Sequence, residues 1–266
     1  MNKNPKSIPD FVNNLQRKGR YAFTKAEAKK AVGESDAVLK LSLWRLAKKQ
    51  RIALVREGFY IIIPMEYAST SVLPPEWFVD DLMKFIQQPY YVGLLSAAAI
   101  HGAAHQQPQE FHVVTLQAQR NLKLGSLQIR FFKKASMKSS STEDSKTPTG
   151  YMKVSNPAVT AIDLVAYASR VGGLDRVLTV LQELSEKITP DMLLEAARKE
   201  RNNAYVQRLG WLLEKSGQDG LVGRLVEWIK LQQPRETPLD PSSPRRGFSR
   251  DPKWKVIVNA EVEGEL

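Results

Sequence analysis

The residues of this chain best suited to metal chemistry are its three histidines, His101, His105 and His112. His101 and His105 lie four positions apart, so on a helix they share one face, as two zinc ligands do. The residues between them are Gly-Ala-Ala, however, and lack the glutamate that a metalloprotease helix uses as its general base. We therefore expect no metal site, and we predict that these histidines are polar residues of a core or an interface.

Two other short motifs suggest enzymatic chemistry but lack what that chemistry requires. Gly125-Ser126 resembles the start of a nucleotidyltransferase site, which needs paired carboxylates to hold magnesium, yet no acidic residue occurs from 111 to 142. Asp80 and Asp81 are adjacent and would point to different sides of a helix. The chain has no phosphate-binding glycine loop and no nucleophile elbow. The sequence predicts a protein that is not an enzyme and needs no cofactor.

Positive charge is concentrated at one end of the chain. The net charge is +11, and residues 1–64 carry 14 Lys or Arg against 5 Asp or Glu. Residues 65–110 are acidic, with one Lys against five Asp or Glu. A small cationic module favours a polyanionic partner. Nucleic acid fits better than a membrane surface, because no strongly amphipathic basic helix stands out.

Residues 1–64 have the pattern of three helices followed by a hairpin. Helices are expected over 7–18, 24–32 and 35–49, and the second begins with the capping box Thr24-Lys25-Ala26-Glu27. Two strands, 52–55 and 59–63, flank a Glu57-Gly58 turn. This order predicts a winged helix-turn-helix DNA-binding domain, in which the third helix enters the major groove.

The third helix has one apolar and one mixed cationic face at 100° per residue. Leu39, Leu43 and Leu46 are expected to pack inward, with Trp44 on the opposite side. Trp44 would contact a thymine methyl or a sugar, or else lie buried against a neighbouring domain. The residues expected to bind DNA are Lys40, Trp44, Arg45, Lys48, Lys49, Arg51 and Arg56.

The rest of the chain predicts an α+β protein with a larger, mostly helical C-terminal domain and a small β-sheet. Helices are expected over 76–88, 91–104, 156–168, 174–186, 191–200, 205–215 and 221–231, strands over 112–116 and 127–132, and a polar loop over 136–150. The predicted division is a DNA-binding domain at 1–64, a linker at 65–75, a C-terminal domain at 76–232 and a partly flexible, proline-rich tail at 233–266.

A second group of cations lies in a stretch without acids. Such a run is often only a solvated surface, but it is also a candidate for a second functional surface. The group consists of Arg120, Lys123, Arg130, Lys133, Lys134 and Lys138.

Composition favours a cytoplasmic location. The chain has no cysteine, which fits a reducing compartment. Its first residues, MNKNPKSIPDF, lack the apolar region of a signal peptide. No apolar run is long enough to span a bilayer.

At the level of whole segments, the chain resembles the AbiEi-type antitoxins of bacterial abortive-infection, type IV toxin–antitoxin systems. The resemblance rests on REGFYIIIP, YYVGLLSAAAIHGAAHQQPQEFHVVT (90–115), SNPAVTAIDLVAY (155–167) and RLGWLLEKSG (208–217). It implies a winged helix that binds inverted repeats in double-stranded promoter DNA and represses its own operon. It also implies a C-terminal domain that counteracts a nucleotidyltransferase-like toxin without forming a stable complex. The cations from Arg120 to Lys138 would then be an antitoxic surface or a second DNA contact.

Two other functions fit parts of the pattern. A ligand-responsive winged-helix transcription factor would bind a small molecule in the C-terminal domain. A nucleic-acid-modifying enzyme would use the winged helix for targeting, but would need a carboxylate or metal constellation. A monomer that binds two repeats cooperatively and a dimer are both compatible with the sequence.

Overall fold

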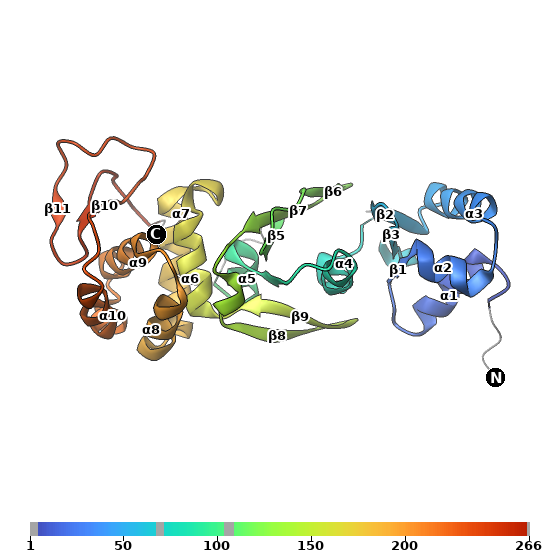
Figure 1. The fold of residues 1–266 in the computed structure, drawn as a ribbon, viewed down its shortest axis with the longest axis horizontal. Coiled ribbons are helices and arrows are strands. Elements are labelled where there is room, and N and C mark those ends of the chain that lie inside the picture. The colour runs from blue at the N-terminus through green and yellow to red at the C-terminus, as the bar shows by residue number, and fades with distance from the viewer. Residues whose placement is uncertain (1–4, 68–71, 104–108, 265–266) are drawn as a thin grey trace.

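The computed structural model describes residues 5–67, 72–103 and 109–264. The chain forms an elongated molecule with the N-terminal module at one end, a six-stranded sheet in the middle and a helical bundle with the C-terminal tail at the other (Figure 1). Helices and strands both contribute throughout, so the expected mixed α and β class is confirmed.

The N-terminal module contains the helices and strands that its capping residues and apolar spacing predict. Thr24 and Glu27 form the capping box, each side chain accepting from the other residue's backbone N–H, at 3.1 and 2.7 Å. Gly33, at φ 73°, ends the second helix in the left-handed conformation. The elements are α1 (Ile8–Arg17), β1 (Ala22–Thr24), α2 (Lys25–Val32), α3 (Asp36–Lys48), β2 (Ile52–Arg56) and β3 (Phe59–Ile62).

The strand β1 is absent from the sequence-based prediction. It pairs antiparallel with β3, so the hairpin becomes a three-stranded sheet in the order β1-β3-β2. With only three residues, β1 is too short to show an alternating pattern. Its Phe23 is buried in the module's core beside Phe11 of α1, with ring centroids 5.5 Å apart.

The central sheet has two covered faces. Its strand order is β6-β7-β5-β4-β9-β8. Successive residues of β7 point to opposite faces of the sheet and belong to different apolar clusters. Phe132 packs with the helical bundle, and Phe131 packs with α4 on the other face. The elements of this region are α4 (Val79–Phe85), β4 (Tyr90–Val92), α5 (Leu94–Ile100), β5 (Glu110–Thr115), β6 (Leu122–Leu124), β7 (Leu127–Lys133), β8 (Thr142–Thr147) and β9 (Gly150–Ser155).

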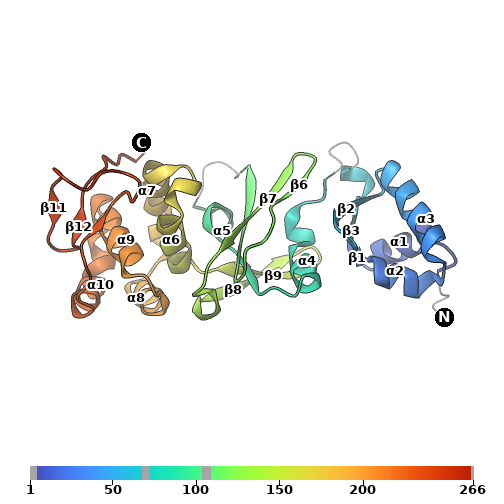
Figure 2. The same ribbon diagram turned by 45° about the horizontal axis from the view of Figure 1, so that its top comes forward.

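The helix α4 lies between the N-terminal module and the sheet (Figure 2). Its Val79 and Leu82 share one buried cluster with Phe59 of β3 and with Val113 and Phe131 of the sheet. The N-terminal module is therefore packed onto the rest of the chain through a continuous apolar core.

Two sequence-based assignments in this region are wrong. The helix expected over 91–104 begins only at Leu94 and ends at Ile100, because Tyr90–Val92 form a strand paired with both β5 and β9. Aromatic and β-branched residues fit that pleated, doubly covered position. The polar loop expected over 136–150 contains the 3-10 turn Met137–Ser139 and the whole of β8. This edge strand is largely exposed, so its residues are polar and lack the apolar alternation from which a strand is predicted.

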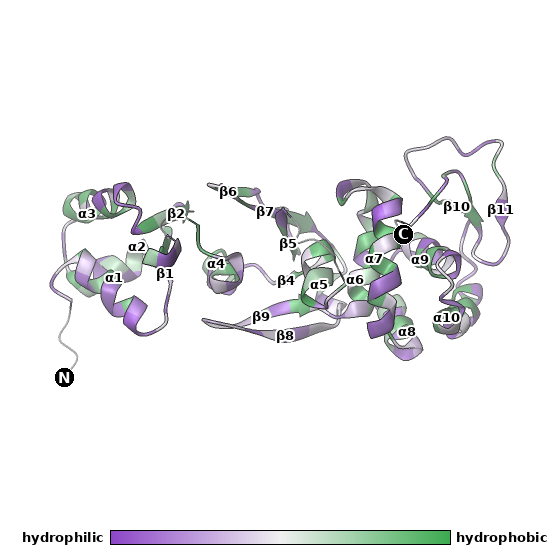
Figure 3. Ribbon diagram, turned by 180° about the vertical axis from the view of Figure 1, so that it is seen from behind, coloured by the Kyte–Doolittle hydropathy of each residue, from purple (hydrophilic) through white to green (hydrophobic). Residues whose placement is uncertain are grey.

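The helical bundle follows the predicted caps. Asn156 and Thr189 cap α6 and α8, and a proline occupies the first helical position of each. The bundle consists of α6 (Pro157–Ala166), α7 (Gly173–Leu184), α8 (Pro190–Lys199), α9 (Asn203–Lys215) and α10 (Asp219–Leu231), and these helices carry both green apolar and purple polar stretches (Figure 3).

The tail is more closely packed than its proline-rich sequence suggests. In its described part, residues 233–264, the regular structure is limited to β10 (Thr237–Pro238), β11 (Arg250–Asp251) and β12 (Val256–Ile257). Trp254 is nevertheless fully buried against Gly210 of α9, and its indole N–H donates to Glu214 at 2.9 Å. Mobility in part of this tail stays a prediction.

Candidate nucleic-acid interface

The helix α3 presents an open face opposite the one it buries. Leu39, Leu43 and Leu46 are at most 6% exposed, which confirms the predicted inward face. On the other side Leu41 is 45% exposed and Trp44 is 53% exposed. Trp44 is thus not buried against another part of this chain.

Four cations surround this open face. Lys40, Arg45, Lys48 and Lys49 are all exposed. Lys48 Nζ lies 4.4 Å from the centroid of the Trp44 ring, a cation–π contact that fixes neighbouring side chains on one surface. Within the described ranges, no ion pair links any of the four to a carboxylate. Their charge is therefore available to an external anion.

The one acidic residue of α3 is engaged in an ion pair. Asp36 forms an ion pair with Lys29 of α2 at 3.1 Å. The hydrogen bond and charge of Lys29 lower the pKa of Asp36, so the carboxylate stays ionised and paired. This pair links α2 to the start of α3 and leaves the open face of α3 cationic.

The two predicted arginines of the hairpin have different surroundings from the α3 cations. Arg51 is half-buried and donates to Asn13 of α1 at 2.7 Å. Arg56 donates to Gln119 at 3.1 Å and to the carbonyl of Arg120 at 3.0 Å. Burial lowers the pKa of Arg56. Arg56 thus holds the N-terminal module against the sheet domain, and its guanidinium is hydrogen-bonded there and not at the α3 surface.

The second cationic group does not form a single surface. The Lys134 side chain is only 11% exposed, with its amine 2.6 Å from Asp163 and 3.1 Å from Glu200. Arg130 pairs with Glu110 at 3.1 Å and donates to the carbonyl of Arg170. The exposed members of the group are Arg120, Lys123, Lys133 and Lys138.

The buried lysine belongs to a polar network inside the core. The Tyr91 hydroxyl donates to the second oxygen of Asp163 at 2.7 Å. Burial favours the neutral amine of Lys134, but the charges of Asp163 and Glu200 outweigh it and raise the pKa of Lys134. Lys134 is therefore a structural cation, and sequence reasoning missed this because its two partners, Asp163 in α6 and Glu200 just after α8, are distant in the sequence.

The histidines of the described chain occupy structural positions. The His101 ring makes a 2.7 Å hydrogen bond with the carbonyl oxygen of Ser155. His112 is 3% exposed, and burial lowers its pKa to about 4. His105 lies outside the described residues. No group of three or more His, Cys, Asp or Glu in the described ranges is placed to hold a metal ion.

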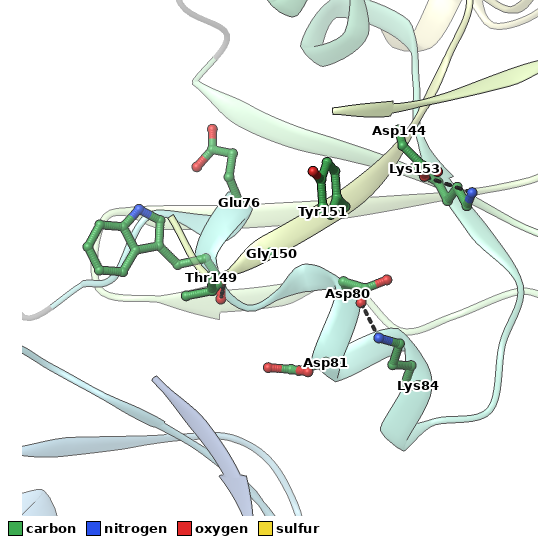
Figure 4. A pocket seen from close by; sticks show the side chains of 10 residues that line it. Glu76, Asp80, Asp81, Lys84, Asp144, Thr149, Gly150, Tyr151 and Lys153 are labelled. Carbon is green, nitrogen blue, oxygen red and sulfur yellow. Dashed lines mark hydrogen bonds and ion pairs between the residues drawn. The ribbon is translucent and has the colours of Figure 1, made fainter. Parts of the chain in front are cut away.

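The adjacent aspartates lie beside a cavity of about 360 Å³ between α4 and the β8–β9 hairpin (Figure 4). Asp80 pairs with Lys84 at 2.6 Å and accepts from the Tyr90 hydroxyl at 2.9 Å. Asp81 points away from Asp80, and burial raises its pKa. The two carboxylates point in different directions, as the helical spacing predicts.

Comparisons with known proteins add two findings. Residues 91–215 match the sequence profile of the family described as AbiEi antitoxin C-terminal domain. A solved structure, the crystal structure of the RV2827C protein from Mycobacterium tuberculosis, is similar with a TM-score of 0.67 and 14% identity. That likeness covers 97% of this chain and 92% of that chain, and it concerns the fold alone. The curated proteins gave no match. Among the helices of the described segments, none combines the length and the apolar character needed to cross a membrane.

Proposed function

Residues 91–215 match the family model described as AbiEi antitoxin C-terminal domain, and from this match we propose that the chain is an antitoxin and also a transcriptional autorepressor. In this proposal the N-terminal module is a winged helix-turn-helix. Its three helices and three-stranded antiparallel sheet have the order and pairing that such a module requires.

The observation that carries the DNA-binding half is the open face of α3. Four exposed cations surround it, and the only acid of the helix is paired with Lys29. In a helix-turn-helix module the second of the two helices enters the major groove, and here that helix is α3. Lys40 and Lys48 would reach base edges or phosphates, and Arg45 and Lys49 would bind phosphates.

The hairpin arginines have separate roles in this proposal. Arg51 directly precedes β2 and is hydrogen-bonded to α1, and it is close enough in sequence to Lys49 to extend the phosphate-binding surface. Arg56 sets the position of the whole module by bonding to the loop that contains Gln119. The DNA target is promoter DNA of the protein's own operon, read as inverted repeats.

The antitoxin half acts on a nucleotidyltransferase-like toxin, without a stable complex. Residues 91–215 contain nearly all of the sheet, α6 and α9, and the four exposed cations of the second group lie within them. These exposed members of the second cationic group are the candidate antitoxic surface: Arg120, Lys123, Lys133 and Lys138. Lys134 and Arg130 would support the domain and not contact the toxin.

A reporter assay in cells tests the repressor half. The upstream region of the operon is fused to a reporter gene, and reporter expression is compared between the full chain and an Arg45→Glu/Lys48→Glu variant. We expect the full chain to repress the reporter and the variant to release it. Growth rescue in the presence of the toxin then shows whether the variant keeps its antitoxic activity. We expect it to do so, because the two functions are proposed to lie in different parts of the chain. A reporter that neither protein represses would overturn the repressor half and leave the antitoxin half standing.

A further inference from the structure

The open face of α3 has a chemical composition that limits what it can read. Besides its cations, the side chains on this face are Ala37, Leu41 and Trp44, and Val38 lies at its edge with 48% exposure. None of these four can accept a hydrogen bond, and only the indole N–H can donate one. An exposed cluster of large apolar side chains on a small cationic module calls for a partner with both charge and apolar groups.

The N-terminal half of α3 is the most restricted part. The residues at the start of a recognition helix are those that contact base edges. In α3 these are Asp36, Ala37, Val38, Lys40 and Leu41, and Asp36 is held by Lys29. Only the Lys40 ammonium remains for hydrogen bonding to bases. The other side chains can make only van der Waals contacts.

One group in the major groove matches such side chains. The C5-methyl of thymine is the only apolar group that the standard bases present there. The flanking phosphates match Lys40, Arg45, Lys48 and Lys49 in charge. We propose that Leu41 and Trp44 read thymine methyl groups, so that this α3 face selects operator positions by apolar contact. This inference rests on the proposed DNA-binding function and adds the class of base that it recognises.

The arrangement of Trp44 supports this role. Lys48 lies one turn further along the helix, with its ammonium 4.4 Å from the ring centroid. That contact covers part of the indole and places a cation at its rim. Trp44 can then present its remaining edge to a methyl group while Lys48 reaches a phosphate or a guanine acceptor.

A second copy of this chain is the less suitable occupant of the same face. A symmetric contact through α3 would bring two sets of cations together, because the same surface patch lies on both copies. In the described part of α3 no unpaired acid is present to offset that repulsion. Nucleic acid offers the opposite charge, so the charge complementarity favours DNA.

The test is a binding titration with two versions of the DNA upstream of the protein's own gene, one synthesised with thymine and one with uracil. Uracil lacks the C5-methyl and keeps the other base-edge groups. The proteins are the full chain, Leu41→Ala, Trp44→Ala and the control Leu231→Ala. Leu231 is 79% exposed on α10, in the helical bundle at the other end of the molecule. It therefore reports the effect of removing an exposed apolar side chain elsewhere.

For the full chain and for Leu231→Ala, we expect uracil DNA to bind about fourfold more weakly for each contacted methyl. For Leu41→Ala and Trp44→Ala, the ratio between the two DNAs should shrink toward one. Equal binding of both DNAs by the full chain overturns this inference and leaves the proposed DNA binding intact. A uracil effect of the same size in all four proteins also overturns it. If neither DNA binds the full chain, the proposed function fails as well. A dimer without DNA that Leu41→Ala dissociates, with no uracil effect, would assign the face to self-association.

Discussion

Lys134, just after β7, and Asp163 of α6 form an ion pair with a 2.6 Å separation in the interior of the protein, where the Asp163 side chain has no exposure. This pair joins the central sheet to the first helix of the bundle. Because Lys134 is paired in this way, it is not available to a binding surface, although it belongs to the acid-free cationic run from Arg120 to Lys138. Charge in the sequence is therefore a poor guide to which cation is free.

The first prediction concerns this pair. Lys134→Met leaves Asp163 and Glu200 buried without a counter-charge, and we expect a loss of about 3–5 kcal/mol in the free energy of unfolding. Lys133→Met is the matched control, because Lys133 is the exposed neighbour and should change stability by less than about 0.5 kcal/mol. Urea unfolding followed by circular dichroism measures both. Equal midpoints for the two variants would contradict the structural role of Lys134.

The second prediction concerns acid stability. Burial lowers the pKa of His112 to about 4, against an ordinary value of 6.5. The unfolded chain therefore takes up a proton at higher pH than the folded one, so stability is full above 6.5 and falls as pH drops toward 4. Between pH 7 and pH 5 the loss from this residue should be about 2 kcal/mol. Urea titrations of the wild type and of His112→Gln at both pH values should show a smaller loss in the variant. A loss of the same size in both proteins would rule out His112 as its source.

The third prediction concerns the tail. A Cβ on Gly210 would collide with the Trp254 ring, so Gly210→Ala should destabilise the protein by about 1–3 kcal/mol. Gly223→Ala is the control, because a Cβ at that exposed helical position meets nothing within 4 Å, and the substitution should stabilise by about 1 kcal/mol. If thermal unfolding shows the same sign for both substitutions, Trp254 does not dock against α9 as described.

The fourth prediction separates the cations that we propose to bind DNA from Arg56, which holds the module against the sheet domain. Lys48→Ala should reduce the slope of log affinity against log salt by about 1, because one phosphate contact is lost. Arg56→Ala should leave that slope unchanged, since its guanidinium is bonded to Gln119 and Arg120. Fluorescence anisotropy at several salt concentrations measures both slopes. A lower slope in Arg56→Ala would place this residue at the DNA.

Local signals in the sequence predict much of the N-terminal module. The Thr24–Glu27 capping box, the Ser35 cap and the leucine spacing of α3 each depend on residues within one or two turns, and the structure contains all three. The open face of α3 follows from the same spacing. The candidate DNA-binding surface is therefore largely readable from the sequence.

Features that depend on distant partners could not be read in this way. Strand β4 forms because β5 and β9 lie on its two sides, although the apolar residues after Tyr91 also suit a helix. Lys134 and Arg56 look like ordinary surface cations until the fold brings Asp163 and Gln119 to them. Strand β8 is polar because it is an exposed edge.

The most direct test of the account is a salt-titrated binding measurement on DNA from upstream of the protein's own gene. Point variants are preferable to removal of residues 1–64, because Val55, Phe59 and Ile61 share a core with α4 and deletion would expose it. The proteins are the full chain, Arg45→Glu/Lys48→Glu and the control Arg120→Glu/Lys123→Glu, which reverses two exposed charges outside α3.

With five phosphates bound by Lys40, Arg45, Lys48, Lys49 and Arg51, the log–log slope should be about −4.5 for each bound copy of the full chain. We expect the control to bind the DNA as the full chain does and the α3 variant to lose binding. Equal binding by the α3 variant and the full chain, or loss of binding only in the control, would contradict the assignment of α3 as the DNA-binding element.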